Sequence, residues 1–310
     1  MMIVTVTLNP ALDQQISLER LVPGTIQWYS QGAFLPGGKG VNVSRLLTSL
    51  GVENRALGIA AGFTGREILR LLEKEGCKTD FVLLEQGTSR INVKLRTPQG
   101  EETALNGAGP QIPQEAVDQL LGKLAGLTGE DLVVLSGSLP QGLPETAYPQ
   151  LLETVRRTGA RLAADMAGDA LLAALPYRPY LIKPNEEELE EIFSLEGPLT
   201  VLEVKEYAGQ LQRMGARNVV VSLGAKGALL LEEGGRCLFC HGVRGKAVST
   251  VGAGDSLVAG FLYGLGLHGT LEGALKWGVA AGAATAFQED LATGDQVKAR
   301  FPAVGNPHIL

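Results

Sequence analysis

The stretch VSTVGAGDSLVAGFLYG, residues 248–264, says more about this chain than any other segment. Two glycines, Gly252 and Gly254, stand just before Asp255, and the apolar residues that follow recur at helical spacing, which predicts a buried helix beginning near Asp255. A glycine-rich turn that opens a helix leaves several backbone N–H groups unpaired at the positive end of the helix dipole. Such a turn suits a phosphate group or a developing negative charge.

Two interpretations of Asp255 follow from its place in this turn. A carboxylate is not expected to bind phosphate, because two anions repel each other, but it can accept a proton from a hydroxyl that attacks a phosphoryl group. Alternatively, Asp255 only caps the helix, which is a common use of aspartate after a turn. Both interpretations fit this stretch, so the rest of the chain has to decide between them.

Composition excludes several classes of protein. The 310 residues, 45% apolar and 19% charged, suit a single globular α/β domain spanning residues 1–310. A net charge of −6 without a basic run argues against a nucleic-acid partner. No segment approaches the roughly 20 apolar residues of a membrane helix, and the first ten residues do not resemble a signal peptide. We therefore expect a cytoplasmic protein with no membrane partner.

The cysteines form one pattern that has to be interpreted, the C-x-x-C-H of Cys237, Cys240 and His241. It matches a haem-attachment pattern and half of a zinc site. Covalent haem would need an exported protein, and zinc needs about four ligands, whereas the remaining cysteine and histidines are scattered. Residues 236–243 are therefore expected to form a short strand.

Near the start of the chain, a buried strand over residues 3–8 leads to Asp13, and a second glycine-rich turn leads into another helix. Asp13 is interpreted either as a ligand for hydroxyl groups or as an ordinary turn residue. The turn, PGGKG at residues 36–40, is not a Walker A loop, because its lysine lies inside the glycines and no Ser or Thr follows it. Its glycines allow a substrate to approach the backbone, and Asn42 follows in the first helical turn.

Residues 14–36 and 89–96 show the alternation of half-exposed strands. In the second segment Arg90, Asn92, Lys94 and Arg96 fall on one face. A solvated charged face is one explanation. The other is that Arg90 and Lys94 bind a substrate phosphate while Asn92 binds a hydroxyl.

Strands and helices then alternate through residues 114–222, which predicts a parallel sheet with helices on both faces. In open sheets of this kind, ligands bind at the carboxyl ends of the strands. The polar residues expected at these ends are Asp13, Ser136, Asp165, Asn185 and Ser222.

The segment KPNEEE, residues 183–188, places Asn185 and Glu188 three residues apart at the start of a helix. These oxygens could order waters around Mg²⁺, or they could form a capping box that needs no metal. Both can hold at once. A phosphate-binding turn, a carboxylate base, a magnesium-suited pair and a basic strand together indicate phosphoryl transfer to a small hydroxylated acceptor.

VSTVGAGDSLVAG, together with PGGKGVNV near the start, resembles the two signatures of the PfkB group of ribokinase-like sugar kinases. The resemblance runs from Thr5 to about Ala286 and implies a three-layer α/β/α sandwich. Its central sheet is mainly parallel, and a small β-sheet lid is formed by strands within about 13–36 and 88–106. The motifs GFTG (62–65), TSRINVK (88–94), LSGSLP (135–140) and LIKPN (181–185) are similar to those of the 1-phosphofructokinase branch, with tagatose-6-phosphate kinases as near relatives.

The resemblance implies ATP-dependent phosphorylation of fructose 1-phosphate at its 6-hydroxyl, with Mg²⁺. Asp255 then acts as the base, and the N–H groups of Gly252, Ala253 and Gly254 form an anion hole. The residues expected to bind the sugar phosphate are Asp13, Gly37, Gly38, Lys39, Asn42, Arg90, Asn92, Lys94 and Ser138. Those expected to bind ATP are Lys183, Asn185, Ser222, Gly224 and Gly227, with Asn185 and Glu188 as metal ligands. A homodimer through the lid is a further expectation.

Two segments depart from the family pattern. Ala167 stands where a serine is expected. The segment FQEDLATGD after Ala286 lacks the usual glycines, so the resemblance does not extend to a monovalent-cation site there. The alternatives are the same chemistry on tagatose 6-phosphate or fructose 6-phosphate, a sugar-phosphate sensor without turnover, and a haem or zinc redox module. A base at Asp255 argues against the sensor, because binding alone does not need one.

Overall fold

A ten-stranded sheet forms the centre of the molecule. The computed structural model describes residues 2–29, 31–98 and 102–310. The strand order is β14-β13-β12-β11-β10-β9-β8-β1-β4-β5, parallel from β5 to β11 and antiparallel from β11 to β14. The strands are β1 (Ile3–Thr7), β4 (Asn54–Ala61), β5 (Val82–Leu84), β8 (Leu132–Ser136), β9 (Arg161–Asp165), β10 (Leu181–Ile182), β11 (Asn218–Ser222), β12 (Gly227–Leu231), β13 (Cys237–His241) and β14 (His308–Ile309).

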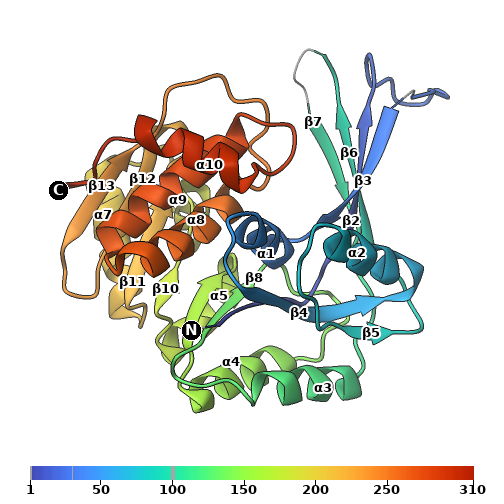
Figure 1. The fold of residues 1–310 in the computed structure, drawn as a ribbon, viewed down its shortest axis with the longest axis horizontal. Coiled ribbons are helices and arrows are strands. Elements are labelled where there is room, and N and C mark those ends of the chain that lie inside the picture. Colours follow the sequence, from blue (N-terminus) through green and yellow to red (C-terminus); the bar gives the residue numbers. More distant parts are fainter. Residues whose placement is uncertain (1, 30, 99–101) are drawn as a thin grey trace.

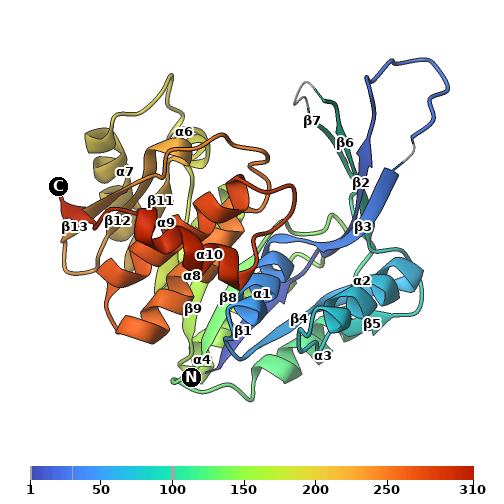
Figure 2. The ribbon, with the colours of Figure 1, turned by 45° about the horizontal axis from the view of Figure 1, so that its top comes forward.

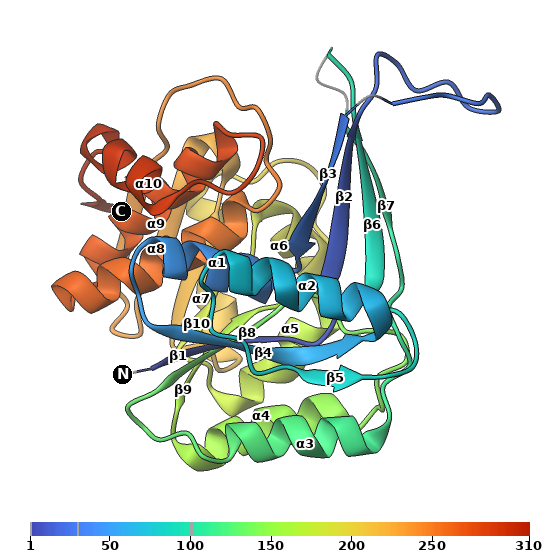
Figure 3. The same cartoon turned by 45° about the vertical axis from the view of Figure 1, so that its right-hand side comes forward.

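Helices cover both faces of this sheet, so the predicted three-layer α/β/α architecture is confirmed (Figures 1 and 3). One face carries α1 (Lys39–Ser49), α2 (Gly62–Lys74), α8 (Ala253–His268), α9 (Leu271–Ala286) and α10 (Gly294–Arg300). The other carries α3 (Gln114–Leu124), α4 (Ala147–Thr158), α5 (Gly168–Ala174), α6 (Glu186–Phe193) and α7 (Val201–Arg213). Short 3₁₀ turns are η1 (Leu175–Tyr177), η2 (Gly224–Lys226) and η3 (Phe301–Ala303).

The first strand illustrates why a central strand of such a sheet is apolar on both sides. Successive side chains point to opposite faces, so Val4 and Val6 pack under α3 and α4 while Ile3 packs against α1 and α8. All five residues of β1 are buried. The helices on the face that carries α8 and α9 pack closely as well: a Cβ added to Gly260 of α8 would lie 2.5 Å from the Cβ of Ala281 in α9.

A second, four-stranded sheet projects from one edge of the layered body (Figures 1 and 2). It consists of β3 (Gln31–Gly37), β2 (Ala11–Ser17), β6 (Arg90–Arg96) and β7 (Glu102–Asn106), in that order. We call it the lid sheet. The predicted strands around 13–36 and 88–106 are therefore present, with one correction. Residues 18–29 form an irregular excursion and not strand, because their apolar side chains find no partner strand and Ile26 and Trp28 are almost fully exposed.

Two further expectations are settled by the fold. Cys237 and Cys240 lie in β13 as predicted; both are buried, and neither forms a disulfide. The turn expected at residues 62–65 proves to be the first turn of α2. Within the described residues, no helix is long and apolar enough to cross a membrane.

Candidate active site

A cleft of about 1220 Å³ opens between the lid sheet, the N-terminus of α8 and the carboxyl ends of β10 and β11. It collects most of the residues predicted from the sequence. The predicted residues that line it are Asp13, Gly38, Lys39, Asn42, Arg90, Asn92, Lys94, Lys183, Asn185, Glu188, Ser222, Gly224, Gly227, Gly252, Ala253, Gly254 and Asp255.

Asp255 lies in the first turn of α8 with its side chain only 7% exposed. Gly252 is the N-cap residue and adopts φ 77°, a left-handed conformation that favours glycine. The Nδ2 of Asn42 donates a 2.7 Å hydrogen bond to Oδ2 of Asp255, so the first turns of α1 and α8 meet at this carboxylate. Burial, reinforced by repulsion from Asp165, raises the pKa of Asp255 to about 6, against the opposing effects of Asn42, Lys39 and Lys183.

Asp165, at the end of β9, joins two lysines that line the cleft. Its Oδ1 lies 3.4 Å from Nζ of Lys39 and 3.3 Å from Nζ of Lys183. Burial opposes ionisation of Asp165, but the two ammonium groups outweigh it and lower the pKa of this carboxyl. The other oxygen, Oδ2, is buried without a hydrogen-bond partner among the described residues. The sequence identified Asp165 only as a strand-end residue; its pairing with both lysines was missed.

Lys39, which is expected to bind the sugar phosphate, also contacts a predicted metal ligand. Besides Asp165, its Nζ contacts Oε1 of Glu188 at 3.5 Å, so in this structure the lysine bridges two carboxylates near the predicted nucleotide side. Burial alone would lower the pKa of Lys39, but attraction to these carboxylates raises it above its usual value. Lys183 lies by the glycine turn: a Cβ added to Gly254 would come within 3.2 Å of its Nζ. A positive charge therefore stands beside the N-terminus of α8.

On the lid sheet, Asp13 is held by two neighbours on β6. Its Oδ1 accepts a 2.8 Å hydrogen bond from Asn92 and its Oδ2 a 2.6 Å contact from Lys94. The parallel register places Asp13 directly beside Asn92, which explains the first contact. Arg90 donates through Nε to the backbone oxygen of Asn9 at 3.1 Å, and burial lowers the pKa of its guanidinium.

Two residues expected to bind the sugar phosphate, Gly37 and Ser138, do not line the cleft, and neither do the strand-end residues Ser136 and Asp165. Gly37 lies behind Asp13, where an added Cβ would come within 2.6 Å of the Asp13 carboxyl, so this glycine makes room for the carboxylate. Ser138 is exposed in the turn after β8, and its Oγ lies 3.5 Å from Nδ2 of Asn9.

Asn185 and Glu188 form the capping box that was one of the two predicted interpretations. Asn185 Oδ1 accepts from the Glu188 N–H at 2.7 Å, and Glu188 Oε2 accepts from the Asn185 N–H at 2.9 Å. The second carboxylate oxygen of Glu188, Oε1, is not part of the capping box and faces Lys39. The capping interpretation is confirmed, and the magnesium interpretation stays a prediction.

The two glycines that are predicted to bind ATP, Gly224 and Gly227, are also required by the backbone conformation. Gly227 has φ 115°, and an added Cβ would lie 2.0 Å from the backbone oxygen of Cys240. Gly224 has φ 53° and no neighbour within 4 Å of an added Cβ, so only its conformation demands glycine. Ser222 pairs with Asn185 in an isolated parallel bridge, which places these two strand ends side by side.

Comparison with known proteins agrees with this geometry. Residues 7–297 match the model of the pfkB family carbohydrate kinases. The chain is 42% identical to the 1-phosphofructokinase of Bacillus subtilis, over 98% of both chains, and 37% identical to the D-tagatose-1-phosphate kinase of Bacillus licheniformis, over 94% of both. Its fold matches the crystal structure of phosphofructokinase-2 from Escherichia coli in complex with fructose-6-phosphate, with a TM-score of 0.89, 30% identity and coverage of 97% and 98%.

The predicted ribokinase-like fold is confirmed by the strand order and by this likeness to solved kinases. The site agrees with kinase chemistry too, because a buried carboxylate, a helix N-terminus and paired lysines converge in one cleft. The family model and the relatives cover nearly the whole chain. This chain therefore belongs to the pfkB family of carbohydrate kinases.

Proposed function

We propose that this kinase transfers the γ-phosphoryl group of ATP to the 6-hydroxyl of fructose 1-phosphate. The observation that carries the proposal is the position of Asp255, a buried carboxylate of raised pKa in the turn that opens α8. The hydroxyl oxygen forms a bond to the γ-phosphorus while the bond from that phosphorus to the bridging β–γ oxygen breaks. The hydroxyl proton passes to Asp255, and ADP leaves.

The lid residues would bind the acceptor. Arg90 and Lys94 supply positive charge for its 1-phosphate, and Asp13 and Asn42 supply acceptors and donors for its hydroxyls. Asp13 is already oriented by Asn92 and Lys94, so little side-chain freedom would be lost on binding. The lid sheet would also keep water away from the transferring phosphoryl group. Together with the layered body it would form a single catalytic domain.

The other side of the cleft would bind ATP through Lys183, Asn185, Ser222, Gly224 and Gly227. Asn185 and Glu188 would be the residues that hold Mg²⁺, and Glu188 Oε1 is the carboxylate oxygen outside the capping box; magnesium prefers a few oxygen ligands together with waters. When bound, the ion would offset negative charge on the ATP phosphates. The N–H groups of Gly252, Ala253 and Gly254, with Lys183 beside them, would stabilise charge on the transferring phosphoryl group.

The test is an ADP-release assay with Mg-ATP and four acceptors in parallel: fructose 1-phosphate, fructose 6-phosphate, tagatose 1-phosphate and tagatose 6-phosphate. We expect the highest kcat/KM with fructose 1-phosphate. Asp255→Asn should lower kcat by at least roughly 10²-fold, the usual scale for a general base, while the sugar phosphate still binds. If a tagatose phosphate or fructose 6-phosphate gives the higher kcat/KM, the assigned acceptor is wrong. If all four bind without turnover, the protein is a sensor.

We also propose that the chain forms a homodimer through the lid sheet. The face turned away from Asp13 carries a row of directly opposed residues in which Phe34, Val93 and Leu105 are apolar. Phe34 is 50% and Leu105 59% exposed, which is unusual for large apolar side chains on a flat sheet. A second copy of the same sheet would cover this row.

A further inference from the structure

Arg96 is the last residue of the lid strand β6, and its side chain lies on the same face as those of Asn92 and Lys94. Its hydrogen bonds, however, go to residues other than those predicted to bind the sugar phosphate. Its Nη2 donates a 2.6 Å hydrogen bond to Oγ of Ser249, and its Nη1 donates at 3.1 Å to the backbone oxygen of Glu289. The guanidinium therefore bridges two separate loops on the α8–α9 side of the cleft. Its third contact, to Glu102, lies within the lid sheet.

Ser249 belongs to the segment that leads directly into the glycine turn. It is 6% exposed, and its Oγ also accepts from the N–H of Val251 at 3.3 Å, the residue just before Gly252. Its own N–H bonds to the backbone oxygen of Ala286 at the end of α9. Arg96 thus contacts the backbone of the anion-hole turn through a single buried hydroxyl.

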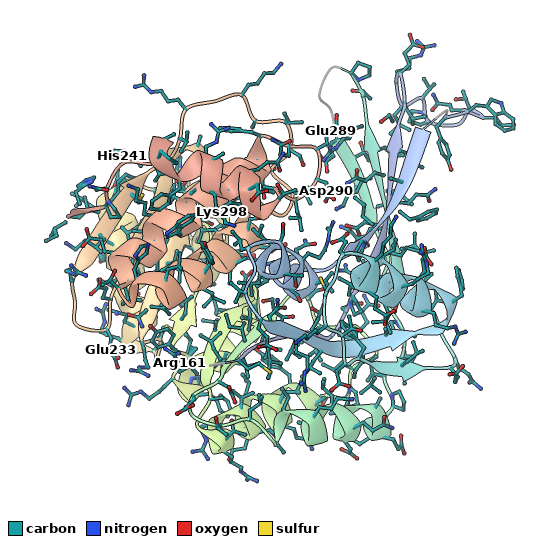
Figure 4. All side chains as sticks on the ribbon, viewed as in Figure 1. Arg161, Glu233, His241, Glu289, Asp290 and Lys298 are labelled. Carbon is teal, nitrogen blue, oxygen red and sulfur yellow. The ribbon has the colours of Figure 1, made fainter. Side chains whose placement is uncertain are left out.

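Glu289 belongs to the loop between α9 and α10, where Figure 4 labels it beside Asp290. Asp290 of this loop pairs with Arg45 of α1 at 3.0 Å. Leu291 lies against Gly252, where an added Cβ would come within 2.6 Å of its Cδ2. The loop is fixed on α1 and on α8, and Arg96 adds a contact to the lid sheet.

We propose that Arg96 is a positioning residue that holds the lid sheet onto the anion-hole turn, so that the lid is closed only when that turn is in place. The proposal rests on the proposed kinase function. A planar guanidinium suits this position because it donates in two directions at once, whereas a lysine ammonium is a point charge on a flexible stem. Without Arg96, the lid sheet and the turn would move independently, and water would reach the transferring phosphoryl group more often.

The kinetic experiment compares Arg96→Gln, Arg96→Lys and Ser249→Ala with the wild type. Arg96→Gln should lower kcat/KM for the sugar phosphate by roughly tenfold or more, the scale of a lost charged hydrogen bond. It should also raise ATP hydrolysis without acceptor relative to sugar phosphorylation, because water replaces the 6-hydroxyl and yields ADP and phosphate. Arg96→Lys should recover part of the loss. The double variant Arg96→Gln/Ser249→Ala should lose less than the product of the single losses.

A second readout needs no acceptor. Hydrogen–deuterium exchange should speed up roughly tenfold in Arg96→Gln for the peptide covering residues 249–254. The control is Arg66→Gln, which removes an exposed arginine pair with Glu85 far from the cleft. Unchanged exchange, or losses that simply multiply in the double variant, would overturn the proposal. If the wild type phosphorylates none of the sugar phosphates while exchange still responds to Arg96, the proposed function fails and the coupling stands.

Discussion

At Asp255, burial and the neighbouring Asp165 disfavour the charge that a general base needs, and Asn42 favours it. Because the folded pKa of about 6 lies above the unfolded value of 3.8, this carboxyl makes the fold less stable as pH rises between those values. This loss of stability falls on the residue that is proposed to accept the proton, and a carboxyl with a pKa near the working pH is the more effective base.

The pH dependence of kcat/KM tests this assignment. Activity should rise with pH through an apparent pKa of about 6, because only the ionised carboxylate accepts the proton. Asn42→Ala removes a hydrogen bond that favours ionisation, so the acidic limb should move to higher pH. Asn306→Ala, which loses only a surface contact to Lys276, is the control and should leave the limb in place. An acidic limb that is the same in Asn42→Ala would mean that Asp255 is not the titrating base.

At the scale of elements, local signals predicted much of the chain. The parallel strands are short apolar runs bounded by glycines and by helical segments. The alternation of strands and helices along the chain could therefore be predicted from the sequence. The excursion at residues 18–29 could not, because its apolar residues resemble a strand pattern and only the absence of a partner strand keeps it irregular.

Contacts between distant segments were harder to predict than elements. The pairs Asp13–Lys94 and Lys39–Asp165 join residues 81 and 126 positions apart, and each depends on strand register or helix placement. From the sequence, the site residues could therefore be predicted by their positions at strand ends and in turns, but their contacts with one another could not. The ion pair between Lys39 and Glu188 could not be predicted, because nothing in the PGGKG motif indicates that Glu188 lies opposite.

The β2–β3 pair offers a test at this scale. Gly37→Ala would place a methyl group within 2.6 Å of the Asp13 carboxyl and so displace it from Asn92 and Lys94. We expect the KM for the sugar phosphate to rise roughly tenfold or more, with kcat less affected and the fold intact, because a charged hydrogen bond is lost. Steady-state kinetics measures this. Gly122→Ala in α3 adds a methyl group into open space and should change neither constant, and equal KM values for both variants would contradict this use of Gly37.

At the scale of the whole molecule, the layered body and the lid sheet have different requirements. The body buries both faces of its central sheet under helices and supplies the fixed groups of the site. The lid sheet has one face toward the cleft, where Asp13 and Lys94 lie, and its other face carries apolar side chains that this chain leaves exposed. A second copy would therefore stabilise the same strands that are proposed to bind the acceptor.

The exposed apolar face of the lid sheet leads to a prediction of the oligomeric state, a homodimer. By light scattering or sedimentation, the wild type should have twice the chain mass of 32.6 kDa. Phe34→Asp or Leu105→Asp should dissociate it, because each places a charge within the row that the second copy would cover, where burying an unpaired carboxylate is strongly unfavourable. Leu202→Asp is the control, since Leu202 is 70% exposed on α7 in the layered body. A monomeric wild type, or dimers that persist in both lid variants, would show that this face does not form the contact.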